Sequence, residues 1–218
     1  MKRLILAGLV ICSILLSTCA CSSQAPTTTQ KGISLSDAPQ VLDITGALQS
    51  NFKHLDAAKE GYSHEDLGLS KYASEVELFA SSEPYGIIYT YFAIYEKQTQ
   101  QIDMDALLKD NEQAKYFAKE NMKALAKKDG LEFGVPNIEV THPAVGDLAV
   151  EVEGSITSLG TKYNFDSLAF KVNQLYVYIY SIYFGSDRLP LLPIAHEIDQ
   201  NIAKFRPTVG ESSRSENS

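Results

Sequence analysis

The sequence predicts an α+β fold: an antiparallel β-sheet of about five to seven strands with helices packed on both faces, an α/β/α sandwich. Three observations support this prediction. Strand-like runs occur in both halves of the chain. Two of these runs, 87–94 and 175–180, are apolar on both faces, which is typical of strands covered on both sides. Helix-like segments lie between and after the runs, so they are available to cover the sheet.

The first half of the chain predicts a strand hairpin followed by a long helix. The segment ASEVELFASSEPYGIIYTYFAIYE, residues 73–96, consists of two strand-like runs around a turn that contains proline and glycine. An imperfect apolar stripe at helical spacing then predicts a helix from Asp103 to Asp129, with Gly130 able to end it. Asp105, in the first turn of this helix, would complement the helix dipole.

The second half predicts four further strands and a closing helix. The strand-like runs are NIEVTH, DLAVEVEG, YNFDSLAFKV and LYVYIYSIYF, and VNQL is a hairpin turn between the last two. In DLAVEVEG, apolar side chains alternate with Glu151 and Glu153, so one face of that strand should meet water. The closing helix should run from about Pro190 to Phe205, because Pro207 prevents its continuation.

The two tyrosine-rich strands should occupy the centre of the sheet, because they are apolar on both faces. Their tyrosines allow two interpretations. The aromatic side chains could line a groove for a ligand, since a tyrosine has an apolar ring and a polar hydroxyl. They could equally be core side chains packed beneath a helix. The groove would be lined by Tyr89, Tyr91, Tyr178 and Tyr180.

The chain opens with a segment typical of protein targeting. Lys2 and Arg3 precede an apolar run from Leu4 to Leu16, which has the length of a signal-peptide core and is too short to span a bilayer as a helix. Small residues then lead into two cysteines in the stretch STCACSS. We predict a signal peptide at 1–20, a flexible tether at 21–34, a single α+β domain at 35–207 and a disordered tail at 208–218.

This N-terminus resembles the lipobox of bacterial lipoproteins, in which signal peptidase II cuts before a cysteine that carries a diacylglycerol. Cys21 follows Ala20, as that pattern prefers, whereas Leu16 lies three residues before Cys19, where the pattern prefers leucine. We predict lipidation at Cys21, with Cys19 as the alternative. The resemblance implies a firm acyl anchor in the cell envelope, facing outward or into the periplasm. If the organism has an outer membrane, serine rather than aspartate after Cys21 favours that membrane.

The mature chain resembles the PsbP-like lipoproteins. The resemblance is carried by SLSDAPQ near the start, the strand hairpin, the mid-chain helix, VGDLAVEV, the terminal hairpin and the closing helix. It implies the α/β/α sandwich and a non-catalytic role in binding or assembly. It transfers no functional residue to this chain.

Composition and motifs disfavour several kinds of chemistry. The net charge of −8 would repel phosphate backbones, so we expect no nucleic-acid partner. No two of the four histidines stand at metal-ligand spacing, and the sequence has no glycine-rich phosphate loop, so we expect neither a metal nor a cofactor. Ser50 and Lys53 match the Ser-x-x-Lys motif of penicillin-recognising enzymes, but its partner motifs are missing. We expect no enzymatic activity.

Three hypotheses for function follow. The first is a membrane-anchored extracytoplasmic lipoprotein whose folded domain binds a protein partner or helps to assemble a complex. The second is a small-molecule carrier or sensor that uses the tyrosine groove. The third is an unrecognised hydrolase, since a catalytic triad depends on geometry and can be hidden in a sequence. A deep pocket at the tyrosine strands would favour the second hypothesis, and a serine hydrogen-bonded to a histidine would favour the third.

Overall fold

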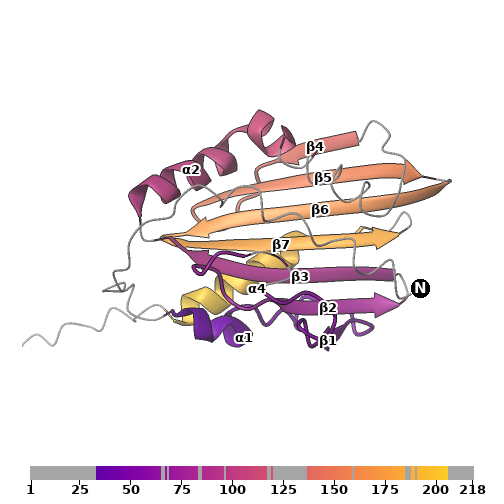
Figure 1. Cartoon of the computed structure of the whole chain (residues 1–218), viewed down its shortest axis with the longest axis horizontal. Helices are drawn as coiled ribbons and strands as arrows, with labels where there is room; N and C mark the ends of the chain where they lie inside the picture. The colour runs from indigo at the N-terminus through magenta and orange to yellow at the C-terminus, as the bar shows by residue number, and fades with distance from the viewer. Residues whose placement is uncertain are drawn as a thin grey trace, which may run out of the picture.

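The computed structural model describes residues 33–64, 67, 69–82, 85–95, 97–116, 119, 137–158, 160–184, 188–189 and 191–205. These residues form a seven-stranded antiparallel sheet with helices, which confirms the α+β prediction (Figure 1). The strands are β1 (Lys53–Leu55), β2 (Glu77–Ser82), β3 (Tyr85–Ile94), β4 (Asn137–Thr141), β5 (Leu148–Ser158), β6 (Thr161–Val172) and β7 (Leu175–Phe184). The helices are the 3₁₀ turn η2 (Leu35–Asp37), α1 (Ala38–Val41), α2 (Gln98–Lys109) and α4 (Leu191–Lys204).

Several predicted segments lie outside the described residues. They include the signal peptide, both candidate lipidation sites (Cys19 and Cys21), most of the tether and the tail at 208–218. None of the helices formed by the described residues is both long enough and apolar enough to cross a membrane.

The strand order is β1-β2-β3-β7-β6-β5-β4, and every neighbouring pair is antiparallel. The tyrosine-rich strands β3 and β7 are therefore neighbours in the middle of the sheet, as predicted. Tyr89 is opposite Tyr180, and Tyr91 is opposite Tyr178. Because side chains alternate along a strand, these four tyrosines lie on one face of the sheet. We call it the tyrosine face.

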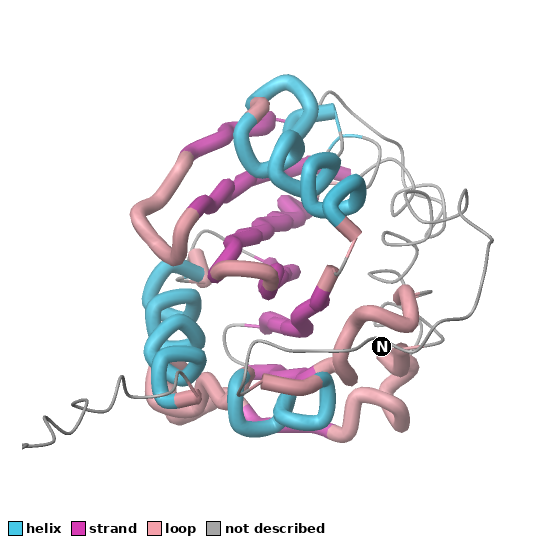
Figure 2. Tube along the Cα trace, turned by 90° about the vertical axis from the view of Figure 1, so that its left-hand side faces the viewer, coloured by secondary structure: helices cyan, strands magenta, loops and turns pink. Residues whose placement is uncertain are grey.

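Helix α4 and the short helix α1 cover the opposite face, which we call the α4 face (Figure 2). The apolar side chains of α4 pack on β6 and β7, and Ile194 and Ile198 are completely buried. Asn201 of α4 donates a hydrogen bond to the carbonyl oxygen of Asp43 (2.8 Å), which holds the segment after α1 against the helix. The bounds of α4 agree with the predicted closing helix, although Pro190 and Pro207 lie outside the described residues.

The mid-chain helix differs from its prediction. It begins at Gln98 rather than Asp103, and it stops before Asp110, whose backbone is extended (φ −102°, ψ 110°). The Oδ1 atom of Asp110 accepts hydrogen bonds of 2.9 and 3.1 Å from two backbone N–H groups in the first turn of a second helical segment, 111–116. Aspartate is a favoured N-cap residue, so it divides the predicted helix into two. The predicted end at Asp129 lies outside the described residues.

The turn between β6 and β7 has the predicted position. Val172 and Leu175 are paired, so Asn173 and Gln174 form a two-residue connection. Asn173 has a left-handed backbone conformation (φ 57°), and its N–H donates a hydrogen bond to Oδ2 of Asp147 (2.6 Å). Asparagine tolerates this conformation better than other residues that carry a Cβ atom.

We predict that Asn173→Val lowers the free energy of unfolding by about 1–2 kcal/mol, because a β-branched side chain is strained at positive φ. Asn173→Gly should stay within about 0.5 kcal/mol of the parent protein, since glycine adopts this conformation without strain. The hydrogen bond to Asp147 uses the backbone N–H, so both variants retain it. Urea unfolding measures the difference, and equal losses in the two variants would contradict this explanation.

Candidate ligand-binding pocket

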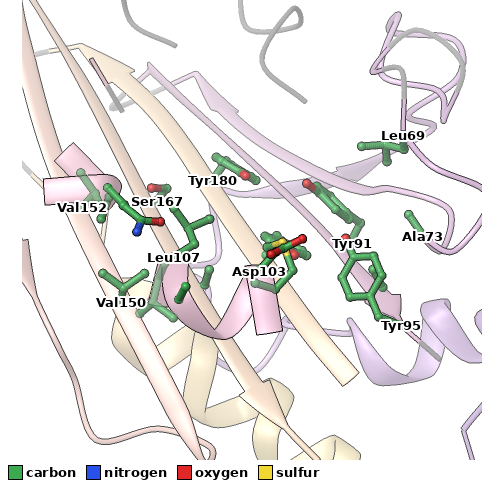
Figure 3. Close-up of a pocket in the computed structure, with 18 of the residues that line it drawn as sticks. Leu69, Ala73, Tyr91, Tyr95, Asp103, Leu107, Val150, Val152, Ser167 and Tyr180 are labelled. Carbon is green, nitrogen blue, oxygen red and sulfur yellow. The ribbon is translucent and has the colours of Figure 1, made fainter. Parts of the chain in front are cut away.

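A pocket of about 440 Å³ lies on the tyrosine face (Figure 3). Its floor is formed by strands β3, β7, β6 and β5. One wall comes from the segment 69–73 before β2, and the other comes from α2 and the helical segment 111–116. We call it the tyrosine pocket. The described residues that line it are Leu69, Ser70, Ala73, Tyr91, Ala93, Tyr95, Asp103, Met104, Ala106, Leu107, Gln113, Ala114, Val150, Val152, Phe165, Ser167, Leu168, Ala169, Tyr178 and Tyr180.

The pocket exists because two separate elements cover the ends of the tyrosine face. At one end, Tyr62 is completely buried and packs on Tyr89, with 5.7 Å between the ring centroids. At the other end, α2 lies over β5. Leu108 is the fully buried residue of α2, whereas Met104 and Leu107 border the pocket. Among the described residues, the central part of the face therefore lies open between the two covers.

Three of the four tyrosines in the predicted groove line the pocket: Tyr91, Tyr178 and Tyr180. Tyr89 is not a lining residue, because Tyr62 covers it. The rings stack across the two strands. Tyr91 and Tyr178 are 4.8 Å apart with 21° between their planes, and Tyr89 and Tyr180 are 4.9 Å apart with 13° between theirs. Stacked rings restrict one another's rotation, so the floor of the pocket is a packed aromatic layer.

Sequence reasoning missed the residues of the walls. Met104 and Leu107 belong to the apolar stripe of the predicted helix, but nothing in the stripe showed which of its members would face a pocket. No pattern in the sequence of segment 69–73 indicated that it would form a wall of the pocket. Asp103, at the start of the predicted helix, is instead an exposed residue at the edge of the pocket.

A polar cluster attaches α2 to the sheet beside the pocket. Lys171 Nζ donates to both carboxylate oxygens of Asp105 (2.8 Å each), and the Tyr176 hydroxyl donates to Oδ1 of the same carboxylate (2.6 Å). Burial alone would raise the pKa of Asp105, but the hydrogen bonds from Lys171 and Tyr176 hold that pKa below its ordinary value. Asp105 therefore fixes α2 to β6 and β7. Since α2 starts at Gln98, Asp105 is not a first-turn residue as predicted.

The described residues contain no group of three or more potential metal ligands. Two histidines have hydrogen-bond partners that hold their rings in place. His54 Nε2 lies 2.6 Å from Oε2 of Glu77. The ring nitrogens of His142 lie 2.9 Å from the carbonyl oxygen of Ala149 and 2.6 Å from Oδ1 of Asn111. None of these contacts involves a serine, so they do not form the pair that a serine hydrolase requires.

A second cluster of titratable groups lies on the α4 face, on the other side of the sheet from the pocket. The side chain of Asp166 is only 3% exposed and accepts a hydrogen bond from the Tyr183 hydroxyl (2.9 Å). Arg188 forms ion pairs with Asp166 and with Glu153. Burial raises the pKa of Asp166 to about 6, and the hydrogen bond from Tyr183 opposes this shift. None of the residues of this cluster lines the tyrosine pocket.

Comparisons with known proteins identify no family. No protein-family model matches the chain, and no curated protein matches it. Among solved structures, the chain is similar to LpqN, a protein involved in cell envelope biogenesis of Mycobacterium tuberculosis. The two are 10% identical over 70% of this chain and 78% of LpqN, with a TM-score of 0.36. A score this low does not establish a shared fold, so the fold is defined by its own strand order and register.

We predict that Tyr178→Ala lowers the free energy of unfolding by about 3–5 kcal/mol, by analogy with Phe→Ala substitutions in protein cores. Tyr178 is 7% exposed and stacks on Tyr91, so truncation removes part of the aromatic layer. Tyr116→Ala is the matched control, because Tyr116 is 68% exposed and its loss should cost less than about 0.5 kcal/mol. Near-native stability of the Tyr178 variant in thermal unfolding would show that this ring is not a core side chain.

Asp166 should make the free energy of unfolding increase as pH falls. Its pKa in the folded state, about 6, is above the ordinary value of 3.8, so between these values the folded state binds the proton more tightly. The contribution of Asp166 to stability should therefore increase by about 2 kcal/mol as pH falls from 7.5 to 4.5, and it should be lost as pH rises through 6. Urea unfolding of the parent and of Asp166→Asn at both pH values measures this. Identical pH dependence in the two proteins would refute the prediction.

Proposed function

We propose that this protein is an extracytoplasmic lipoprotein whose folded domain binds an apolar small molecule in the tyrosine pocket, without catalysing a reaction. Its lipid anchor is at Cys21, with Cys19 as the alternative. The observation that carries the proposal is the pocket itself, which lies at the tyrosine strands. Such a pocket is the feature expected of a carrier or sensor rather than of an assembly factor.

The size and lining of the pocket support this function. Its volume of about 440 Å³ lies within the range of about 300–1,000 Å³ that is typical of small-molecule sites. Such sites are mainly apolar with a few polar groups that orient the ligand. The polar groups of this lining, apart from the tyrosine hydroxyls, are Ser70, Asp103, Gln113 and Ser167.

The N-terminal sequence supports the anchor and the location in the cell envelope. A basic start, an apolar core of signal-peptide length and a cysteine after small residues occur together. We also propose that the domain is a PsbP-like α/β/α sandwich. Helix α4 on one face of the sheet and helix α2 on the other support that assignment.

A second candidate function is the binding of a protein partner. Ile102 and Tyr116 are large apolar side chains that are 59% and 68% exposed. They belong to α2 and to the segment 111–116, which together form one wall of the pocket. Exposed apolar side chains of this size are typical of contact surfaces, although two of them make only a small patch.

The experiment that tests the proposal is mass spectrometry of the protein extracted from its own membrane, under denaturing and native conditions. We expect the denatured mass to show a chain that begins at Cys21 and carries acyl chains. We expect the native spectrum to show additional mass from a bound small molecule, which denaturation releases. A chain without acyl groups would refute the anchor, and identical masses in the two spectra would count against a bound ligand.

A matched pair of variants locates the bound molecule. Ala169→Phe places a ring inside the tyrosine pocket, because Ala169 of β6 lines it. Ala80→Phe makes the same change in β2, on the same face of the sheet but outside the lining. The additional native mass should be lost in the first variant and retained in the second. Loss in both, or in neither, would place the ligand elsewhere.

A further inference from the structure

The tyrosine pocket has a charged group at its edge. Asp103 carries the one charged side chain among the described residues that line the pocket (Figure 3). It is an exposed residue in the middle of α2. Within the described part of the chain, no hydrogen bond or ion pair neutralises its carboxylate, so it can interact with a ligand.

The lysine that binds α2 to the sheet is paired with a different carboxylate. Lys171 of β6 donates two hydrogen bonds to α2, and both go to Asp105. Its ammonium group also lies 5.2 Å from the centroid of the Tyr176 ring. This lysine therefore attaches α2 to the sheet and is not part of the pocket lining. The overall charge of −8 adds to the negative potential around the opening.

The interior of the pocket favours a different chemical group of the ligand from the one that its charged edge favours. Val150, Val152 and Phe165 are almost completely buried and present only apolar atoms to the cavity. Displacing water from such surfaces favours an apolar body, whereas a charged group placed there would lose its hydration without compensation. A ligand that satisfies the whole pocket therefore has an apolar body inside and a polar end at Asp103.

We propose that the ligand is an apolar molecule whose polar end carries a positive charge, such as a long-chain amine, and that the Asp103 carboxylate binds that end. This inference rests on the proposed function of the pocket and adds the charge of its ligand. A charge-assisted hydrogen bond between an ammonium group and a carboxylate is about twice as strong as a bond between neutral groups. A fatty acid, by contrast, would bring a second carboxylate to the same position and be repelled.

The test compares two probes of the same chain length and opposite charge, decylammonium and decanoate. Each is added to the full chain, purified in a neutral detergent, and bound probe is counted by native mass spectrometry. We expect decylammonium to bind at about a tenfold lower concentration than decanoate. Asp103→Asn should bring the two concentrations close together. Asp199→Asn, which makes the same charge change on α4, should leave the preference intact.

The outcomes separate the two proposals. If neither probe binds, or if Ala169→Phe fails to reduce binding, the pocket is not the ligand site and the proposed function fails. If both probes bind equally and Ala169→Phe abolishes both, the pocket is a ligand site and the inference about charge is wrong. A preference for decylammonium that survives Asp103→Asn would also overturn the inference, because the selectivity would then come from the overall charge of the protein.

Discussion

The pairing of β3 with β7 is the constraint on which the rest of the structure depends. Both strands are apolar on both faces, so neither is stable at an edge of the sheet or with a face in water. Each face of these two strands must therefore be covered by another part of the chain. Helix α4 covers one face, with side chains such as Ile194 and Ile198 completely buried in the core of that face. In the part of the chain that the structure describes, the tyrosine face has two partial covers, and the space between them is the pocket.

The attachment of α2 explains why the described residues do not fill that space. A helix that is held mainly by apolar burial must pack its apolar side chains closely against the sheet. Here the Asp105 carboxylate, bonded to Lys171 and Tyr176, contributes a polar attachment beside the pocket. Leu108 is the one residue of α2 that is fully buried. Met104 and Leu107 can therefore border a cavity, because they are not required to fill it.

The sequence predicts well what depends on local pattern. Alternation, turn residues and the two-sided apolar runs were sufficient to place strands β2 to β7, the closing helix and the central position of β3 and β7. The three-residue strand β1 was missed, because so short a run carries no pattern. The division of the mid-chain helix at Asp110 depends on one side chain capping the next segment. The covering of Tyr89 by Tyr62 and the position of Asp103 depend on contacts between distant segments, which a single sequence does not reveal.

The sheet order also constrains the route by which the protein folds. Gly86 of β3 pairs with Tyr183 of β7, so more than half of the predicted domain separates the two partners in the chain. Contacts between such distant residues form slowly, since a large loop must close before they contribute any free energy. When the N-terminal part of the chain emerges first, the β2–β3 hairpin forms before β7 is present. Until β7 pairs with β3, both apolar faces of the hairpin are exposed and the free edge of β3 lacks hydrogen-bond partners. A chain exported in an unfolded state would thus be most prone to aggregate at this hairpin, until its last strand arrives.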